Sequence, residues 1–448
     1  MNEVSILLSV LLFLSCLAIS IVRAVKYARL ELLDWSFLAI GAGYGIGWVI
    51  VLTDSISNTN NYWRSWILPN SDLYLIHTLC VMVLLAAIWV GWHLMSLSSW
   101  IRHSTVKNVA GNIISTNKTA VIAWIILGSA ILLQWLYTRA YGGFFGIFEY
   151  SRALRSGILL INNSFSFLQP FGTLSLISSF IFFGLILSRR KKYFVSFGLL
   201  ISFFFSLYIL YSRQGRIGFL IYISTFALGY AFHRRIRPIA LLAGTGILLL
   251  GVLIAAYILT ITLNLHQTSS LTSFLAKELA FPFVSFFAQI NSGEHLHRGF
   301  IDFLVTPLYF LPSSFWAGMV DNATEINTTV IIGASKGQDG VTGGIPVDLL
   351  TLGVMQFSSI GILLTGMLYG CLLRALQSLL KRISIPGLRV TFEAFIIFRI
   401  AIFAVFYAHP AHVVAACFGL CITAVIMYIS NKRYKYGHTI ITAQIQHK

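Results

Sequence analysis

Long apolar runs separated by polar loops dominate the hydropathy pattern of this chain. A run of about 17–25 mostly apolar residues is long enough to cross a bilayer as a helix. The runs lie at about residues 4–22, 35–53, 73–97, 120–138, 165–187, 193–211, 217–233, 239–260, 350–373, 390–408 and 411–430. The pattern therefore predicts an all-α polytopic membrane protein with about 11 transmembrane helices.

One connection, residues 261–347, is much longer than the others. Loops of this length are usually functional or disordered, and this one contains aromatic-rich amphipathic stretches such as LTSFLAKELAFPFVSFFAQI. Such stretches favour interfacial or re-entrant helices. We therefore expect an N-terminal transmembrane bundle (1–260), a large loop containing helices (261–347) and a C-terminal transmembrane unit with a tail (348–448).

The composition agrees with a protein dissolved in lipid, because 57% of the residues are hydrophobic and only 10% are charged. The formal charge of +17 lies in short loops between spans and in the C-terminal tail, where it meets anionic lipid. We therefore expect membrane lipids, and not nucleic acid, as partners of this charge.

The basic residues also predict the orientation. With the spans above, 21 of the 31 Lys and Arg residues fall on one side, which the positive-inside rule assigns to the cytoplasm. The first apolar run has no basic residue before it and three after it, so it is expected to be an uncleaved anchor. The N-terminus and the long loop are then predicted to lie outside and the C-terminus inside.

Ten basic residues remain on or near the outer side, and eight of them are arginines. The topology does not require them there. Arginine binds phosphate through several hydrogen bonds of fixed geometry. The outer arginines therefore indicate a phosphate-bearing substrate.

The hairpin YSRQGRIGF, between two predicted spans, holds Arg213 and Arg216 around Gly215. Two guanidinium groups on a tight turn can bind a diphosphate. The alternative is that they snorkel to lipid headgroups, although lysine would serve that purpose equally well.

A second group, in EYSRALRSG, places Arg152 and Arg155 three residues apart, on one face of a helix. These two residues either contact a ligand or pair with Glu149.

The long loop contains the cluster GEHLHRGF, with Glu294, His297 and Arg298. A neutral histidine or a carboxylate beside a cation suits removal of a proton from a hydroxyl. The alternatives are a solvated polar turn here and a base supplied by His409 or His412. Within a predicted span, Arg399 is costly unless it is paired or faces a cavity, so we expect it to point inward.

Several motifs are missing. The chain contains no D-x-D or E-x-D pair, no phosphate-binding glycine loop with its lysine, and no G-x-S-x-G elbow. The cysteines lie within predicted spans and imply no disulfide framework. We therefore expect no metal and no cofactor, and a diphosphate leaving group would have to be neutralised by arginines.

At the exit of the long loop, the stretch GGIPVDLLTLGVMQFSSIGILLTGMLYG resembles the signature of the oligosaccharide repeat unit polymerases, the Wzy-type O-antigen polymerases. The resemblance rests on a G-G-x-P turn that enters a glycine-punctuated helix. The SRQGR hairpin is also similar to a turn of this family. The matching positions are Gly343, Gly344, Pro346, Gly353, Gly361 and Gly370.

The resemblance implies a membrane-embedded glycosyltransferase of the GT-C type, at the periplasmic face of the bacterial inner membrane. It would transfer a growing glycan from undecaprenyl diphosphate to the terminal sugar of a new lipid-linked oligosaccharide. A polysaccharide chain-length regulator is implied as a further partner.

Site roles follow as hypotheses from the resemblance and the residues together. The base that activates the acceptor hydroxyl would be Glu294, His297 or Asp348. The diphosphate would be bound by basic residues, which are Arg152, Arg155, Arg213, Arg216, Lys277, Arg298 and Arg399.

Two other functions remain open. An O-antigen ligase would use similar parts to move finished polymer onto lipid A core. A flippase or other lipid-linked glycan transporter would also need outer arginines, but the long loop and the absence of paired halves count against it.

Overall fold

The structure is a computed structural model, which describes residues 2–57, 63–97, 116–156, 163–188, 193–213, 216–247, 251, 271–294, 296–310, 322–338, 341, 343–410 and 413. About 85% of it is helical and no strand occurs in the described residues. The all-helical class predicted from the hydropathy pattern is confirmed.

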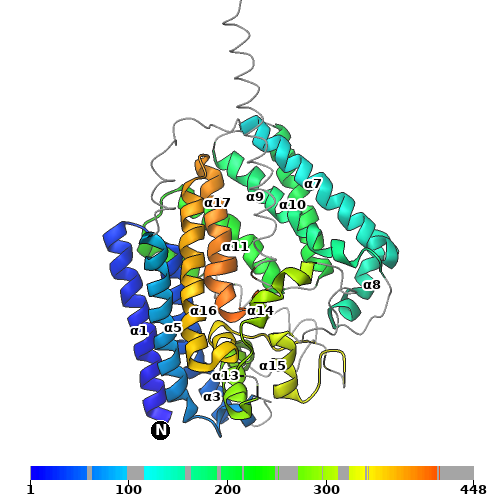
Figure 1. The fold of residues 1–448 in the computed structure, drawn as a ribbon. Coiled ribbons are helices and arrows are strands. Elements are labelled where there is room, and N and C mark those ends of the chain that lie inside the picture. The colour runs from blue at the N-terminus through cyan, green and yellow to red at the C-terminus, as the bar shows by residue number, and fades with distance from the viewer. Residues whose placement is uncertain are drawn as a thin grey trace, which may run out of the picture.

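Two groups of helices form the described part (Figure 1). The first consists of α1 (Asn2–Tyr27), the continuous series α2 (Leu32–Ile40), η1 (Gly41–Ile46) and α3 (Gly47–Ser57), then α5 (Leu73–Leu97) and α16 (Leu349–Lys381). The second consists of α7 (Thr116–Thr138), α9 (Leu174–Leu187), α10 (Tyr193–Ser212), α11 (Arg216–His233) and the series α17 (Pro386–Ile396), η6 (Ile397–Ile402) and α18 (Phe403–Phe406).

Short helices complete the described chain. They are α4 (Arg64–Ile67), η2 (Arg139–Tyr141), α8 (Gly143–Ser156), η3 (Ser166–Thr173), α14 (Ile301–Leu304), η4 (Thr306–Phe310) and α15 (Ala323–Ile332). The series from α17 to α18 joins the two groups, because it packs against α9 and α11 on one side and against α2 and α16 on the other.

Eight helices of the described part are long and apolar enough to cross a membrane. Seven of them coincide with predicted spans, and the eighth, Leu271–Ser292, lies in the long loop. Two further apolar helices, Gly218–His233 and Pro238–Ile247, are shorter than these eight. The predicted span 411–430 lies outside the described residues except for Val413. A polytopic membrane protein is thus supported, while the count of eleven spans stays a prediction.

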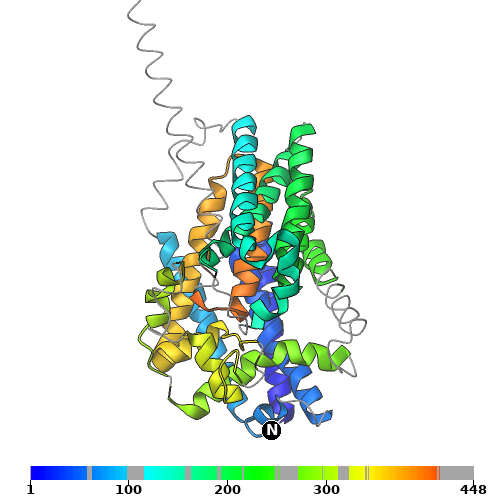
Figure 2. The same ribbon diagram turned by 90° about the vertical axis from the view of Figure 1, so that its right-hand side faces the viewer.

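The eighth helix, α13 (Leu271–Ser292), is not oriented like the others. It lies across the long axes of the upright helices, at the end of the molecule that holds the N-terminus (Figure 2). It buries Phe283, Phe286 and Phe287 and packs against α3, α15 and α16. The structure thus has a helix in the loop, as the sequence predicted, and its interfacial or re-entrant position stays a prediction.

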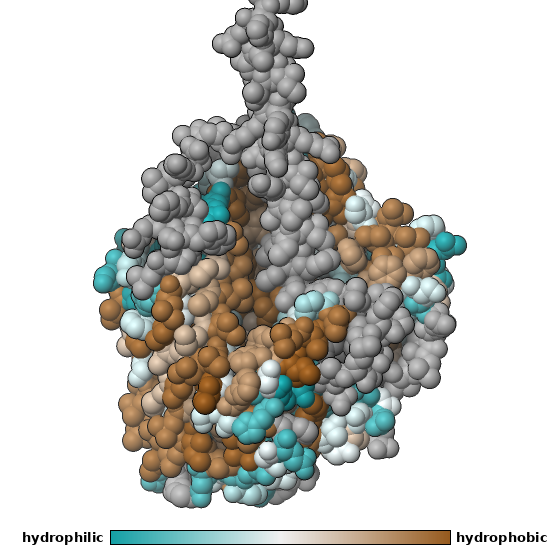
Figure 3. All heavy atoms as spheres, in the orientation of Figure 1, coloured by the Kyte–Doolittle hydropathy of each residue, from teal (hydrophilic) through white to brown (hydrophobic). Residues whose placement is uncertain are grey.

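Apolar side chains cover much of the described surface, most broadly over α1, α5 and α16 (Figure 3). On α1, exposed residues such as Leu7, Val22 and Val25 leave a face that no other described element covers. An apolar surface of this extent suits contact with lipid.

Close helix packing explains part of the glycine-punctuated motif. A Cβ atom added at Gly370 of α16 would lie 2.1 Å from the carbonyl oxygen of Ile88 in α5. One added at Gly361 would lie 2.0 Å from the carbonyl oxygen of Gly353. Only glycine permits these backbones to approach so closely.

Candidate functional site

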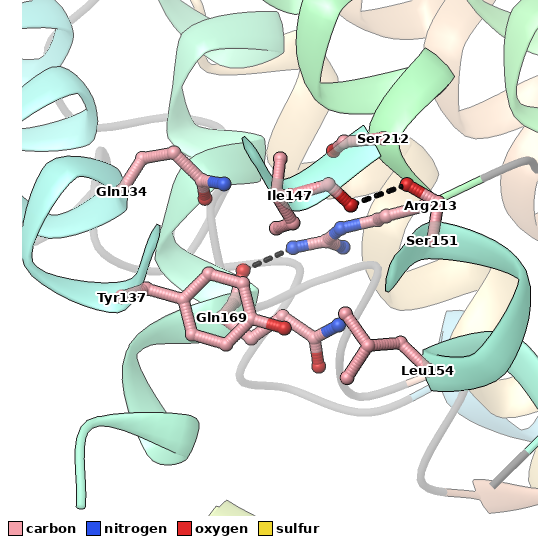
Figure 4. A pocket seen from close by; sticks show the side chains of 8 residues that line it. All are labelled: Gln134, Tyr137, Ile147, Ser151, Leu154, Gln169, Ser212 and Arg213. Carbon is pink, nitrogen blue, oxygen red and sulfur yellow. Dashed lines mark hydrogen bonds between the residues drawn. The ribbon is translucent and has the colours of Figure 1, made fainter. Parts of the chain in front are cut away.

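A cavity of about 170 Å³ lies where α7, α8, η3 and α10 meet (Figure 4). We call it the arginine pocket, and it is lined by Gln134, Tyr137, Ile147, Ser151, Leu154, Gln169, Ser212 and Arg213. The pocket thus combines one cation, several neutral polar groups and two aliphatic side chains.

Arg213 is held in place by the main chain of η3, since its Nη2 donates a hydrogen bond to the carbonyl oxygen of Gln169. The pKa of Arg213 is lowered to about 10, mainly by burial; Tyr137 opposes this shift and the positive charge of Arg399 adds to it. A guanidinium with this pKa stays protonated at neutral pH. Arg213 therefore brings a permanent charge into the pocket.

The positive charge of Arg399, a residue distant in sequence, also acts on Arg213. Arg399 belongs to the π-helical segment η6 and is half-buried, with its guanidinium 5.5 Å from the centre of the Phe403 ring. π-helical turns often occur at functional sites. A second positive charge that acts on Arg213 also favours the binding of an anion there.

The other arginines of the two sequence motifs belong to elements next to the pocket. Arg152 and Arg155 belong to α8, the helix whose Ser151 and Leu154 line the pocket, and Arg216 begins α11. Their side chains lie outside the described part of the structure. The fold therefore brings the backbones of the two arginine motifs predicted from the sequence to one pocket.

Arg298 lies in a different environment, which we call the helix-break cluster (Arg298, Asp302, Gln356 and His409). Its Nε and Nη2 donate hydrogen bonds of 2.8 and 3.0 Å to the two carboxylate oxygens of Asp302. Asp302 is fully buried and also accepts from Gln356 Nε2, at 2.9 Å, and from the backbone N–H of Ala323, at 3.1 Å. Arg298 is thus engaged in a bidentate ion pair.

The cluster sits at an interruption of α16. Phe357 and Ser358 leave the helical conformation there, and Ser358 has a φ of 52°. The loop uses the freed backbone groups. Arg298 N donates to Met355 O, Gly299 N donates to Gln356 O, and Ser358 N donates to Leu296 O. The break in α16 therefore anchors the long loop to the bundle.

The environment of the cluster shifts the pKa values of Asp302 and His409. Burial by itself would raise the pKa of Asp302, but hydrogen bonds from Arg298 and Gln356 and the neighbouring charges hold it below its ordinary value. Burial lowers the pKa of His409, whose Nε2 lies 4.0 Å from Asp302 Oδ1. At neutral pH the cluster therefore contains an ionised Asp302, a charged Arg298 and a neutral His409.

Asp348, one of the proposed bases, is the N-cap of α16. Its carboxylate accepts hydrogen bonds from the N–H groups of Leu350 and Thr351 and a 2.6 Å bond from the Tyr44 hydroxyl. Burial raises the pKa of Asp348 to about 6, against the effect of these hydrogen bonds. With no exposed surface, Asp348 acts in this structure as a helix cap and not as an accessible base.

The remaining predicted residues lie elsewhere. Glu294 and His297 are exposed in the segment after α13, and Lys277 is half-buried on α13. None of the three lines the arginine pocket. Their catalytic and binding roles stay predictions.

Sequence reasoning missed several residues of both regions. Asp302 follows Arg298 by four residues, a spacing that could have suggested the ion pair. Gln134, Tyr137 and Gln169 carry no comparable signal, because all three lie within predicted spans and look like ordinary residues of a membrane helix. No group of three His, Cys, Asp or Glu side chains suited to a metal occurs within the described ranges.

No protein-family model, no curated protein and no solved structure matches this chain.

Proposed function

We propose that this protein is a membrane-embedded glycosyltransferase that polymerises lipid-linked oligosaccharide repeat units. It would move the growing glycan from undecaprenyl diphosphate to the terminal sugar of a new unit. The observation that carries the proposal is the arginine pocket, which is lined by Arg213 and by α8, the helix of Arg152 and Arg155. The positive charge of Arg399 also acts on Arg213. The resemblance of the G-G-x-P motif to the repeat unit polymerases supplies the reaction.

The chemistry requires a leaving diphosphate to be stabilised. The bond between the anomeric carbon and the phosphate oxygen breaks, a bond from that carbon to the acceptor oxygen forms, and the acceptor proton passes to a base. Fixed guanidinium groups stabilise the charge that develops on the leaving oxygen. Arg213 and Arg399 would do so without a metal ion.

The candidates for the catalytic base differ in their exposure to solvent, and we choose between them on that ground. Glu294 and His297 are exposed, whereas Asp348 is buried and already accepts three hydrogen bonds. We therefore favour one of the two loop residues as the group that takes the acceptor proton.

The proposal also includes the fold type, the membrane in which the protein lies and its orientation there. We infer a GT-C-like arrangement in the bacterial inner membrane, with the N-terminus and the active site on the periplasmic side. A chain-length regulator would be its protein partner. The common end of the N-terminus, α13 and α15 supports a shared side for these elements (Figures 1 and 2).

The test is a reconstitution. The purified protein in nanodiscs is incubated with an undecaprenyl-diphosphate-linked repeat unit and no nucleotide or metal, and the products are resolved by length. We expect a ladder of glycans for the wild type and none for Arg213→Ala. Transfer only to a lipid A core acceptor would indicate a ligase instead.

The matched control is Arg139→Ala. Arg139 also lies at the outer end of α7, but it is exposed and stacks on Trp135, at 5.2 Å, outside the pocket. This variant should retain the ladder. An unchanged ladder in Arg213→Ala would refute the assigned role of the pocket.

A further inference from the structure

One group in the arginine pocket does not fit a site for phosphate alone. Gln134 is 2% exposed, and its side-chain amide points into the pocket (Figure 4). Its Oε1 atom is buried and accepts no hydrogen bond from any described residue. A buried acceptor of this kind is costly, so it calls for a partner that the ligand would supply.

The missing partner must be a hydrogen-bond donor. The phosphates of a lipid diphosphate offer almost only acceptors at neutral pH, so they match Arg213 but not the carbonyl oxygen of Gln134. A sugar hydroxyl can donate a hydrogen bond and also accept one. The pocket therefore carries complementary groups for a phosphate at one end and for a hydroxyl at the other.

The size and lining of the cavity further limit the class of ligand that fits. At about 170 Å³ the cavity is smaller than the roughly 300–1,000 Å³ of pockets that hold drug-sized molecules. It has room for one sugar ring and not for an oligosaccharide. Tyr137 supplies an aromatic wall, which suits the apolar face of a sugar (Figure 4).

We propose that the arginine pocket is a glycosyl phosphate site, in which Arg213 binds the phosphate and Gln134 and Tyr137 bind the first sugar attached to it. Under the proposed function, on which this assignment to the donor substrate rests, the enzyme would read the sugar nearest the lipid. Gln134 is then a specificity residue, distinct from the arginines that bind the diphosphate.

Binding to simple probes tests the site without the polymerisation reaction. The full-length protein in phosphatidylcholine nanodiscs is titrated with glucose, galactose and N-acetylglucosamine 1-phosphates, and with methyl phosphate for comparison. We expect at least one sugar phosphate to bind about tenfold more tightly than methyl phosphate, since a satisfied buried amide and a ring contact are gained.

The variants separate the two ends of the pocket. Gln134→Leu should remove most of the preference for the sugar phosphate and leave methyl phosphate binding unchanged. Arg213→Ala should weaken both probes, and Arg139→Ala should weaken neither. Gln134→Met provides a second apolar replacement if Gln134→Leu does not fold, as judged by its helical circular dichroism.

Three results would overturn the proposal. They are equal binding of sugar phosphates and methyl phosphate, a preference that survives in both Gln134 variants, and loss of sugar phosphate binding in phosphatidylglycerol nanodiscs, which would identify a lipid headgroup site. A Gln134-dependent preference without any glycan ladder would leave the site standing and refute the polymerase. A glycan ladder without any preference for the sugar phosphate would support the polymerase and refute the glycosyl phosphate site.

Discussion

The arginine pocket and the helix-break cluster both contain an arginine that the sequence marks as a phosphate ligand, yet their surroundings are opposite. Arg213 faces a cavity and forms no ion pair with any described carboxylate. Arg298 donates two hydrogen bonds to Asp302 within a buried network. Its side chain is only 12% exposed.

The difference shows that a lone arginine motif does not define an anion site. A guanidinium attracts a substrate phosphate only when no carboxylate already neutralises it. The charge of Arg298 is compensated by the bidentate contact with Asp302, and the loop is held to α16 at this point. Arg213 keeps its charge for a ligand.

The largest expected effect is on the helix-break cluster. Asp302→Ala should lower the free energy of unfolding by about 3–5 kcal/mol, because Arg298 would be left buried without its carboxylate. Unfolding in mixed micelles, followed by circular dichroism, measures this loss. Glu278→Ala, at an exposed position within α13, is the control and should change stability by less than about 0.5 kcal/mol. An Asp302→Ala protein as stable as the control would show that the cluster does not anchor the loop.

A smaller decrease in the free energy of unfolding is expected when the pH is lowered. The folded state holds the pKa of His409 below its ordinary value, so unfolding binds a proton and stability is lost as pH falls below about 6.5. One such group contributes at most about 1.4 kcal/mol per pH unit. Asp302, whose folded pKa is also lowered, adds a second loss in the acid range below about pH 4.

The variant His409→Gln isolates the first step of this profile. Glutamine keeps a donor near Asp302 and does not titrate, so the fall in stability between about pH 6.5 and 5 should become shallower than in the wild type. Identical unfolding profiles from pH 8 to 5 would contradict the neutral His409 in the cluster.

The smallest effect on stability is expected in the arginine pocket. Arg213→Ala should change the free energy of unfolding by less than about 1 kcal/mol. The substitution removes one hydrogen bond to Gln169 and leaves no buried carboxylate without its partner. Activity in the reconstituted polymerisation should nevertheless disappear. A destabilisation as large as that of Asp302→Ala would remove the contrast between the two regions.

Much of the site could not be predicted from the sequence, because its contacts join residues that are far apart along the chain. The motif around Arg213 could be recognised because its residues are adjacent, but the contact of Arg213 with Gln169 joins residues 44 positions apart. Asp348 looked like a base in the sequence. Its cap bonds to Leu350 and Thr351 are local, but its burial and the hydrogen bond from the Tyr44 hydroxyl, 304 positions away, come from the fold.

The sequence by itself determined the class of this protein, because the length and apolarity of each run decide locally whether it can form a membrane helix. It also indicated a helix in the stretch that forms α13, where composition reflects local geometry. Only the tertiary structure decided which arginine is neutralised and which faces a cavity. That outcome depends on where distant carboxylates, amides and backbone carbonyls are brought by packing, and no local pattern encodes those distances.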